Sequence, residues 1–330
     1  MANKNKSENW NYHPDLPLVD PSIFNSPTNL KLLAFWFSKN WLTLSERVLM
    51  LILAVTLWFT VYPSLESAET WAFGWIAQTW AVNMILVFCI AGGLHWFFYM
   101  KNGQGAKLKF SNRDLMRNNR KFSFRDQVKD NMFWSMGSGV AQLTLLQVIT
   151  MWLMANDYAP TIAISENPAW FIIAIILIPI WSAFHFYWAH RLLHIPFFYT
   201  RFHNLHHRNI DLGPWSGFSM HPVEHFIYLS SICIHWVIAR NPIYLILHII
   251  FQSPGAAMTH TDYEDLLIKN KRSLAPGTFY HTLHHRYFEC NYGNQEIPWD
   301  RWFRIFHDGI AKLTSTTRDQ KQKQKIYSQL

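Results

Sequence analysis

The stretch RFHNLHHRN, residues 201–209, decides the architecture of this chain. It contains a His-x2-His-His cluster that recurs in HTLHH at residues 281–285, and a His-x3-His pair stands just before it in HRLLH at residues 190–194. Eight of the 17 histidines fall into these three boxes, which adjoin strongly apolar segments. The eight are His190, His194, His203, His206, His207, His281, His284 and His285.

The number and spacing of these histidines predict a site for two metal ions. Neutral imidazole is the commonest metal ligand in proteins and suits iron, zinc, copper and nickel. One zinc ion needs about four ligands, so eight imidazoles exceed the needs of a single zinc. Residues three or four apart share a helix face, so His190 and His194 point the same way, as do His203 and either His206 or His207. Three such clusters in an apolar chain favour a buried dinuclear site over ordinary packing histidines.

The composition indicates a membrane protein. Of the 330 residues, 50% are hydrophobic, 17% are aromatic and only 15% are charged, whereas globular domains average about 25% charged residues. The 17 tryptophans fit this reading, because tryptophan collects at membrane interfaces. The formal net charge of +8 is explained by basic cytoplasmic loops rather than by nucleic-acid binding. The three cysteines are far apart and predict neither a disulfide framework nor a zinc finger.

Four stretches are apolar and long enough to approach the roughly 20 residues of a bilayer crossing. The loop between the second and third, residues 101–131, carries nine lysines and arginines against three aspartates, which places it in the cytoplasm by the positive-inside rule. The fourth stretch then delivers the first histidine box to the cytoplasmic face. The four stretches are residues 42–62, 71–100, 133–154 and 168–189.

Two shorter apolar segments, residues 226–239 and 243–258, separate the second box from the third. Either a hairpin that dips into the bilayer or two tilted spans would return the chain to the same side. All three boxes then meet on one face. The sequence therefore predicts an all-α integral membrane protein with about four transmembrane helices, a short membrane hairpin and a cytoplasmic helical cap that holds a dinuclear metal site.

Domain boundaries follow from the same changes in composition. Residues 1–41 are expected to form a cytoplasmic arm with an interfacial or short core segment at LLAFWF, and residues 42–154 the N-terminal transmembrane helices with the basic loop. Residues 155–310 are expected to form the catalytic domain. Residues 311–330 read as a polar, exposed or disordered tail.

The histidine boxes resemble those of the membrane-bound fatty acid hydroxylase/sterol desaturase superfamily. GPWSGFSMHPVEH at 213–225, FECNYGNQ at 288–295 and PWDRWFRIFHDG at 298–309 extend the resemblance. It implies a stem of about four spans under a cytoplasmic cap with two iron ions, which zinc can replace after purification. It also implies hydroxylation or desaturation of a lipid of the sterol or fatty acyl type. Dioxygen and a separate electron donor, a cytochrome or ferredoxin with its reductase, would take part.

The resemblance assigns roles position by position. The eight box histidines match the family's metal ligands, and His260 in HTDYE matches a further family histidine. In the fatty acid hydroxylase branch a second histidine follows four residues later, where this chain has Glu264, so the chain is closer to the sterol-oxidase branch. The remaining candidates either bind metal or support a ligand from outside. They are His221, Glu224, His225, Glu264, Asn204 and Asn291, with Asp300 as a further outer partner.

Two other readings of the residues stay open. A metal-dependent membrane lipid hydrolase would need an open metal position and a general base, and commonly uses fewer histidines. A transporter would carry its histidines midway through the spans and show internal repeats. The electron donor of the first reading has a candidate dock in the basic loop at Lys107, Lys109 and Arg113.

Overall fold

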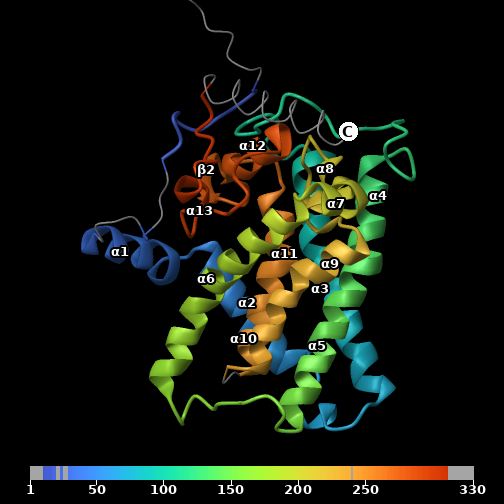
Figure 1. The fold of residues 1–330 in the computed structure, drawn as a ribbon, viewed down its shortest axis with the longest axis vertical. Coiled ribbons are helices and arrows are strands. Elements are labelled where there is room, and N and C mark those ends of the chain that lie inside the picture. Colours follow the sequence, from blue (N-terminus) through green and yellow to red (C-terminus); the bar gives the residue numbers. More distant parts are fainter. Residues whose placement is uncertain (1–9, 20–22, 25–28, 239–240, 311–330) are drawn as a thin grey trace, which may run out of the picture.

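The computed structural model describes residues 10–19, 23–24, 29–238 and 241–310. Long helices form a stem, and shorter elements gather as a cap at one end of it (Figure 1). The stem comprises α2 (Glu46–Thr60), α3 (Phe73–His95), α5 (Val140–Ala155), α6 (Pro168–Leu193) and α10 (Pro242–Gln252). The cap comprises residues 101–126, α7 (Pro196–Phe198), α8 (Asn204–His207), β1 (Leu266–Ile268), β2 (Lys271–Leu274), α12 (Phe279–Tyr287) and α13 (Trp299–Trp302).

Three helical stretches among the described residues are long and apolar enough to cross a membrane. They carry large apolar side chains on their outer surfaces: Phe88 is 52% exposed and Ile172 is 58% exposed. Such surfaces need lipid or another apolar partner. The stretches are Phe73–Met100, which joins α3 to η3 (Trp96–Met100), Gln127–Ala155, which joins α4 (Gln127–Trp134), η4 (Ser135–Gly139) and α5, and Pro168–Leu193.

The first predicted span is not a straight crossing. Helix α1 (Leu30–Phe37) and η1 (Ser38–Leu42) meet α2 at an angle of 41°, and only as one bent pair do they make a fourth candidate span. The break falls where Ser45 caps α2 by accepting a hydrogen bond from the amide of Val48. Figure 1 shows α1 lying across the long axis of the stem. The sequence predicts four spans. The described residues contain three continuous candidate spans, and the bent pair makes a fourth if it counts as one span.

Two boundaries differ from the predicted ones for local reasons. The third span begins at Gln127 rather than residue 133, because the Asp126 carboxylate caps the helix by accepting from the Lys129 amide at 3.0 Å. The fourth continues past residue 189 to Leu193 with Pro179 inside it, and ends just before Pro196. Its last turn therefore carries His190.

The predicted membrane hairpin packs inside the stem. It runs through α9 (Pro222–Leu229), η7 (Ser230–Trp236), α10 and α11 (Pro254–Thr259). Every residue of α10 except Phe251 is buried, and the helix packs against α2 and α6 around Met50, Ile178 and Leu247. A segment of 11 residues is too short to cross a bilayer alone, and neighbouring helices enclose it.

The cap departs from the all-α expectation in one detail. Strands β1 and β2 pair antiparallel as a small hairpin between His260 and α12. The N-terminal arm also joins the cap, because Trp10 packs edge-on against Phe279 at 4.8 Å and the Arg286 guanidinium lies 3.7 Å from the centre of the Trp10 ring. The predicted tail, residues 311–330, lies outside the described part of the chain. Short turns complete the connections at η2 (Glu66–Ala68), η5 (Tyr199–His203) and η6 (Pro214–Phe218).

Candidate metal centre

Nine histidines converge in two groups where the stem meets the cap. In each group, one ring nitrogen of every member lies within 4.8 Å of the others. The groups adjoin, since the His207 and His285 rings are 4.7 Å apart. All eight box histidines and His260 belong to one group or the other. The five-histidine group is His190, His194, His203, His207 and His284, and the four-histidine group is His206, His260, His281 and His285.

Helix geometry explains how the second and third boxes each serve both groups, whereas both histidines of the first box enter the five-histidine group. In the second box, His203 and His207 are four residues apart and enter the five-histidine group together, while His206 turns to the other. The third box is reversed: His281 and His285 enter the four-histidine group, and His284 crosses to the first. Adjacent residues point about 100° apart on a helix of 3.6 residues per turn. A His-x2-His-His box therefore links two neighbouring sites.

Backbone carbonyls fix which ring nitrogen is free in five of the nine histidines. The closest such contacts join His190 Nδ1 to the Tyr292 oxygen and His284 Nδ1 to the Cys290 oxygen, both at 2.7 Å. A carbonyl oxygen can only accept, so Nδ1 carries the proton and Nε2 keeps its lone pair. The other three are His206 to Ser219 at 3.2 Å, His260 to Ala256 at 2.9 Å and His285 to Asn209 at 3.1 Å.

The free nitrogens then face one another. His260 and His285 each place Nε2 at 3.1 Å from Nε2 of His281. Since neither partner has a proton on that nitrogen, His281 can satisfy only one of them. In the other group, the bare Nε2 of His284 lies 3.0 Å from Nε2 of His207. Lone pairs that converge without enough protons repel, and a cation between them removes the repulsion, so the donor set fits a metal ion in each group.

Burial keeps these imidazoles neutral, as metal ligands must be. It lowers the pKa of His206 to about 4 and that of His203 to about 3. Burial also lowers the pKa of His207 well below its ordinary value, with further lowering from neighbouring histidines. At neutral pH these rings compete little with protons for a bound cation.

Glu224 supports the five-histidine group from outside. Its Oε1 lies 2.7 Å from His203 Nδ1, and it belongs to neither group. Burial raises the pKa of this carboxyl to about 8. A cation bound to His203 would favour the carboxylate form, which accepts the Nδ1 proton and turns Nε2 toward the group.

Several candidates lie outside both groups and are engaged elsewhere. His225 contacts Ser138 Oγ at 3.0 Å and the Phe218 carbonyl at 3.1 Å through its two ring nitrogens. The remaining three serve local structure: His221 Nδ1 accepts from the Val223 amide, Asn204 donates to the Thr200 carbonyl, and Glu264 accepts from Tyr12 and pairs with Arg272 at 3.1 Å.

Asn291 and Asp300 brace the loop whose carbonyl oxygens contact His190 and His284. Asn291 donates to the Tyr280 and His307 carbonyls at 3.2 and 3.0 Å. Asp300 accepts from the amides of Tyr292 and Gly293 at 2.8 and 2.7 Å, and the Tyr292 carbonyl is the partner of His190 Nδ1. The carbonyl partners themselves were not predicted, because sequence letters carry no information on where a main-chain oxygen points.

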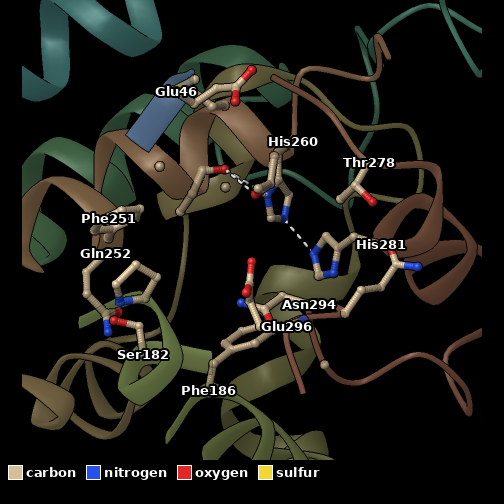
Figure 2. A pocket seen from close by; sticks show the side chains of 18 of the residues that line it. Glu46, Ser182, Phe186, Phe251, Gln252, His260, Thr278, His281, Asn294 and Glu296 are labelled. Carbon is tan, nitrogen blue, oxygen red and sulfur yellow. Dashed lines mark hydrogen bonds between the residues drawn. The ribbon is translucent and has the colours of Figure 1, made fainter. Parts of the chain in front are cut away.

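A cavity of about 550 Å³ opens beside the histidines, a size suited to a drug-sized or lipid-sized ligand. Figure 2 shows His260 and His281 on its wall, facing Phe186 and Phe251. Its wall continues to α1 through Leu32, Phe35 and Trp36. The cavity therefore connects the histidine groups with the helix that lies across the stem. Other histidines on its wall are His190, His203 and His206.

Comparison with known proteins places this geometry in context. Residues 174–305 match the family described as Fatty acid hydroxylase. The Delta(7)-sterol 5(6)-desaturase of Gibberella zeae is 32% identical over 135 residues, 40% of each chain, and that of Saccharomyces cerevisiae is 34% identical over 115 residues, 35% of this chain. A putative Delta(7)-sterol-C5(6)-desaturase of Arabidopsis thaliana is 27% identical over 184 residues, 54% of this chain and 64% of its own. The chain spans 40% of the length of the Gibberella protein and 31% of the yeast protein. No solved structure matches.

Proposed function

The chain belongs to the membrane fatty acid hydroxylase/sterol desaturase superfamily, and on that premise we propose that it is a membrane-bound di-iron oxidoreductase that hydroxylates or desaturates a lipid. Dioxygen is the oxidant, and a separate protein donates the electrons. The observation that carries the proposal is the convergence of nine histidines into two adjoining groups on the wall of one cavity.

The protein is an integral membrane protein, and we propose that the cap and both histidine groups lie on its cytoplasmic side. The basic residues of 101–131 belong to the cap end of the spans, as the positive-inside rule requires for that orientation. The proposed boundaries remain an arm and interfacial segment at 1–41, spans at 42–154, the catalytic region at 155–310 and a tail at 311–330.

The named residues would hold two iron ions, one in each histidine group. Bound iron would supply oxygen activation and removal of hydrogen from an unactivated C–H bond. The protein's part is to fix the ligands before substrate arrives. The Tyr292 and Cys290 carbonyls aim Nε2 of His190 and His284, and Glu224 can do the same for His203.

The cavity supplies the other requirement, which is a dry place for a long apolar molecule. Phe186, Met220 and Phe251 line it, and such side chains exclude water from the reacting carbon. We propose that a sterol or fatty acyl lipid enters from the bilayer past Phe35 and Trp36 of α1. The named relatives act on a Delta(7)-sterol, so a sterol is the first substrate to test.

Lipid mass spectrometry of a host with and without the gene tests this function. We expect a product that gains one oxygen or loses two hydrogens, and its loss when His206 and His207 are both changed to Ala. Purified protein should carry two iron ions, and product formation should require oxygen. One zinc ion and oxygen-independent release of an acyl group would instead support the hydrolase reading.

A further inference from the structure

Two polar side chains on the cavity wall have no role in the histidine groups. They are Ser182 of α6 and Gln252 at the end of α10. Ser182 Oγ and Gln252 Oε1 are buried and have no hydrogen-bond partner among the described residues. An unpaired buried oxygen costs free energy, which a hydrogen bond to a ligand group can recover.

The amide of Gln252 is oriented by a buried polar network behind it. Gln252 Nε2 lies 3.4 Å from His248 Nε2. His248 in turn contacts Ser231 Oγ at 2.9 Å and His235 Nε2 at 3.0 Å. The amide nitrogen is thereby directed to the network, which leaves the carbonyl oxygen as the polar atom for the other side. His235 and His248 therefore position this side chain.

The chemistry of the pair selects one kind of group. Gln252 Oε1 accepts a hydrogen bond and the Ser182 hydroxyl can donate one. A hydroxyl group both donates and accepts, so a single hydroxyl satisfies both side chains. Neither side chain carries charge, and a carboxylate or phosphate placed here would lack a cationic partner from the pair.

The position of the pair along the stem sets how the substrate lies. Ser182 precedes His190 by eight residues on α6, about 12 Å of helix. Gln252 likewise precedes His260 by eight residues. Figure 2 shows Ser182 and Gln252 beside Phe251, at the end of the view away from His260 and His281. The hydroxyl and the carbon presented to the histidines are therefore on separate parts of the substrate.

We infer that Ser182 and Gln252 form a recognition site for the hydroxyl group of a lipid alcohol, which they hold while a distant carbon faces the histidine groups. This inference deepens the proposed oxidation of a lipid and rests on it for the fate of the substrate. It places Ser182 and Gln252 as specificity residues. A substrate lacking the hydroxyl would leave both oxygens unpaired.

Binding to the purified full chain tests the site without relying on turnover. The probes are a Delta(7)-sterol, a long-chain alcohol, and the analogue of each without its hydroxyl. We expect the chain to bind at least one alcohol about ten- to a hundred-fold more tightly than its deoxy analogue. The alcohol that shows the preference identifies the sterol or the aliphatic source.

The variants Gln252→Leu and Ser182→Ala should each weaken binding of that alcohol about tenfold and leave the deoxy analogue unchanged. Ser182→Ala removes one oxygen and tests the site if Gln252→Leu fails to fold. Gln142→Leu is the matched control, because Gln142 is a glutamine of the stem that donates to the Pro222 carbonyl and does not line the cavity.

Equal binding of alcohol and deoxy analogue by the unchanged chain would overturn the inference, as would an undiminished preference in both variants. If the pair binds only a water molecule, the alcohol and its deoxy analogue would likewise bind equally. Failure of the proposed function would look different. An iron-loaded chain that prefers the alcohol over its deoxy analogue but oxidises neither alcohol would support the hydroxyl site and contradict the proposed reaction.

Discussion

Single residues determine how the histidine groups are supported, and the contrast between two glutamates shows this. Glu224 lies 2.7 Å from His203 Nδ1 in a buried setting, whereas Glu264 pairs with Arg272 near the surface. Both stood in the sequence as possible ligands, and the structure places neither in a histidine group. The Glu224 carboxylate can therefore orient His203, whereas the Glu264 carboxylate contacts none of the grouped histidines.

The change Glu224→Gln should therefore lower metal affinity about 10- to 100-fold, because an amide holds the Nδ1 proton of His203 more weakly than a carboxylate. Metal content of the purified protein against a chelator series measures it. Glu264→Gln is the matched control and should leave the affinity unchanged. Equal metal loss in both variants would show that Glu224 has no orienting role.

Nine of the histidines could be predicted from the sequence as a set, but not their division into two groups. Spacing indicates that His203 shares a face with His206 or with His207, and only the fold shows that the partner is His207. The carbonyl partners, such as Tyr292 and Cys290, could not be predicted either. The direction of a main-chain oxygen depends on the conformation of its loop, which only the fold determines.

The buried histidines predict how the metal-free protein responds to acid. In the unfolded chain a histidine titrates near 6.5, whereas burial lowers the pKa of His206 to about 4 and that of His203 to about 3. The unfolded state therefore binds more protons below pH 6.5, and stability falls as the pH drops from 6.5 toward 4. The expected slope is about 1.4 kcal/mol per pH unit for each such histidine.

Unfolding midpoints followed by tryptophan fluorescence between pH 7.5 and 5 measure this loss. A variant with both His203 and His206 changed to Gln has two fewer titrating groups and should show a flatter dependence. A metal-free protein whose midpoint stays constant over that range would contradict the expected neutrality of the buried rings.

At the scale of elements, the fold depends on close approaches between segments that are distant in sequence. A Cβ atom at Gly217 of η6 would come within 2.0 Å of the Ala256 carbonyl oxygen on α11. That oxygen accepts the Nδ1 proton of His260. The glycine therefore lets two elements touch where one of them orients a histidine of the four-histidine group.

We expect Gly217→Ala to destabilise the protein by about 1–3 kcal/mol, as overpacking does, and to weaken metal binding by the four-histidine group through displacement of Ala256. Thermal unfolding and metal titration measure the two effects. Gly93→Ala in α3 is the control, because nothing lies within 4 Å of its added Cβ, and it should be neutral or stabilising. A shift in stability with intact metal content would mean that Ala256 adjusts without moving His260.

Element extents were predictable where composition alone controls them. The second span agrees with the predicted residues 71–100 to within two residues, since apolar length defines it. The bend between α1 and α2 and the small β1–β2 hairpin were not predictable, because both depend on tertiary contacts with distant parts of the chain. Helix α10 is as apolar as a span, and only its surroundings show that protein rather than lipid covers it.

On the scale of the whole molecule, the proposed reaction requires electrons to reach histidines that the protein buries. The part of the basic loop that belongs to the cap, residues 101–126, lies at the same end of the molecule as α8 and α12 (Figure 1). Of the three residues first suggested as a dock, Lys107 and Arg113 are exposed. Lys109 is only 9% exposed, and its Nζ donates to the Arg113 carbonyl at 2.7 Å. Lys109 is therefore structural, and the surface available to a partner is that of its neighbours.

Reversal of the two exposed charges, Lys107→Glu with Arg113→Glu, tests this surface. If an acidic electron donor docks here, association slows about tenfold or more at low ionic strength, and the difference shrinks as salt screens the charges. Turnover driven by the purified donor should fall, while turnover driven by a small chemical reductant should not. Lys31→Glu reverses one charge on α1, outside the basic loop, and should alter neither rate. The cavity and the basic loop lie on different elements, so the proposed donor and lipid could bind at the same time. If donor-driven turnover survives the charge reversal, the donor docks on another face of the cap.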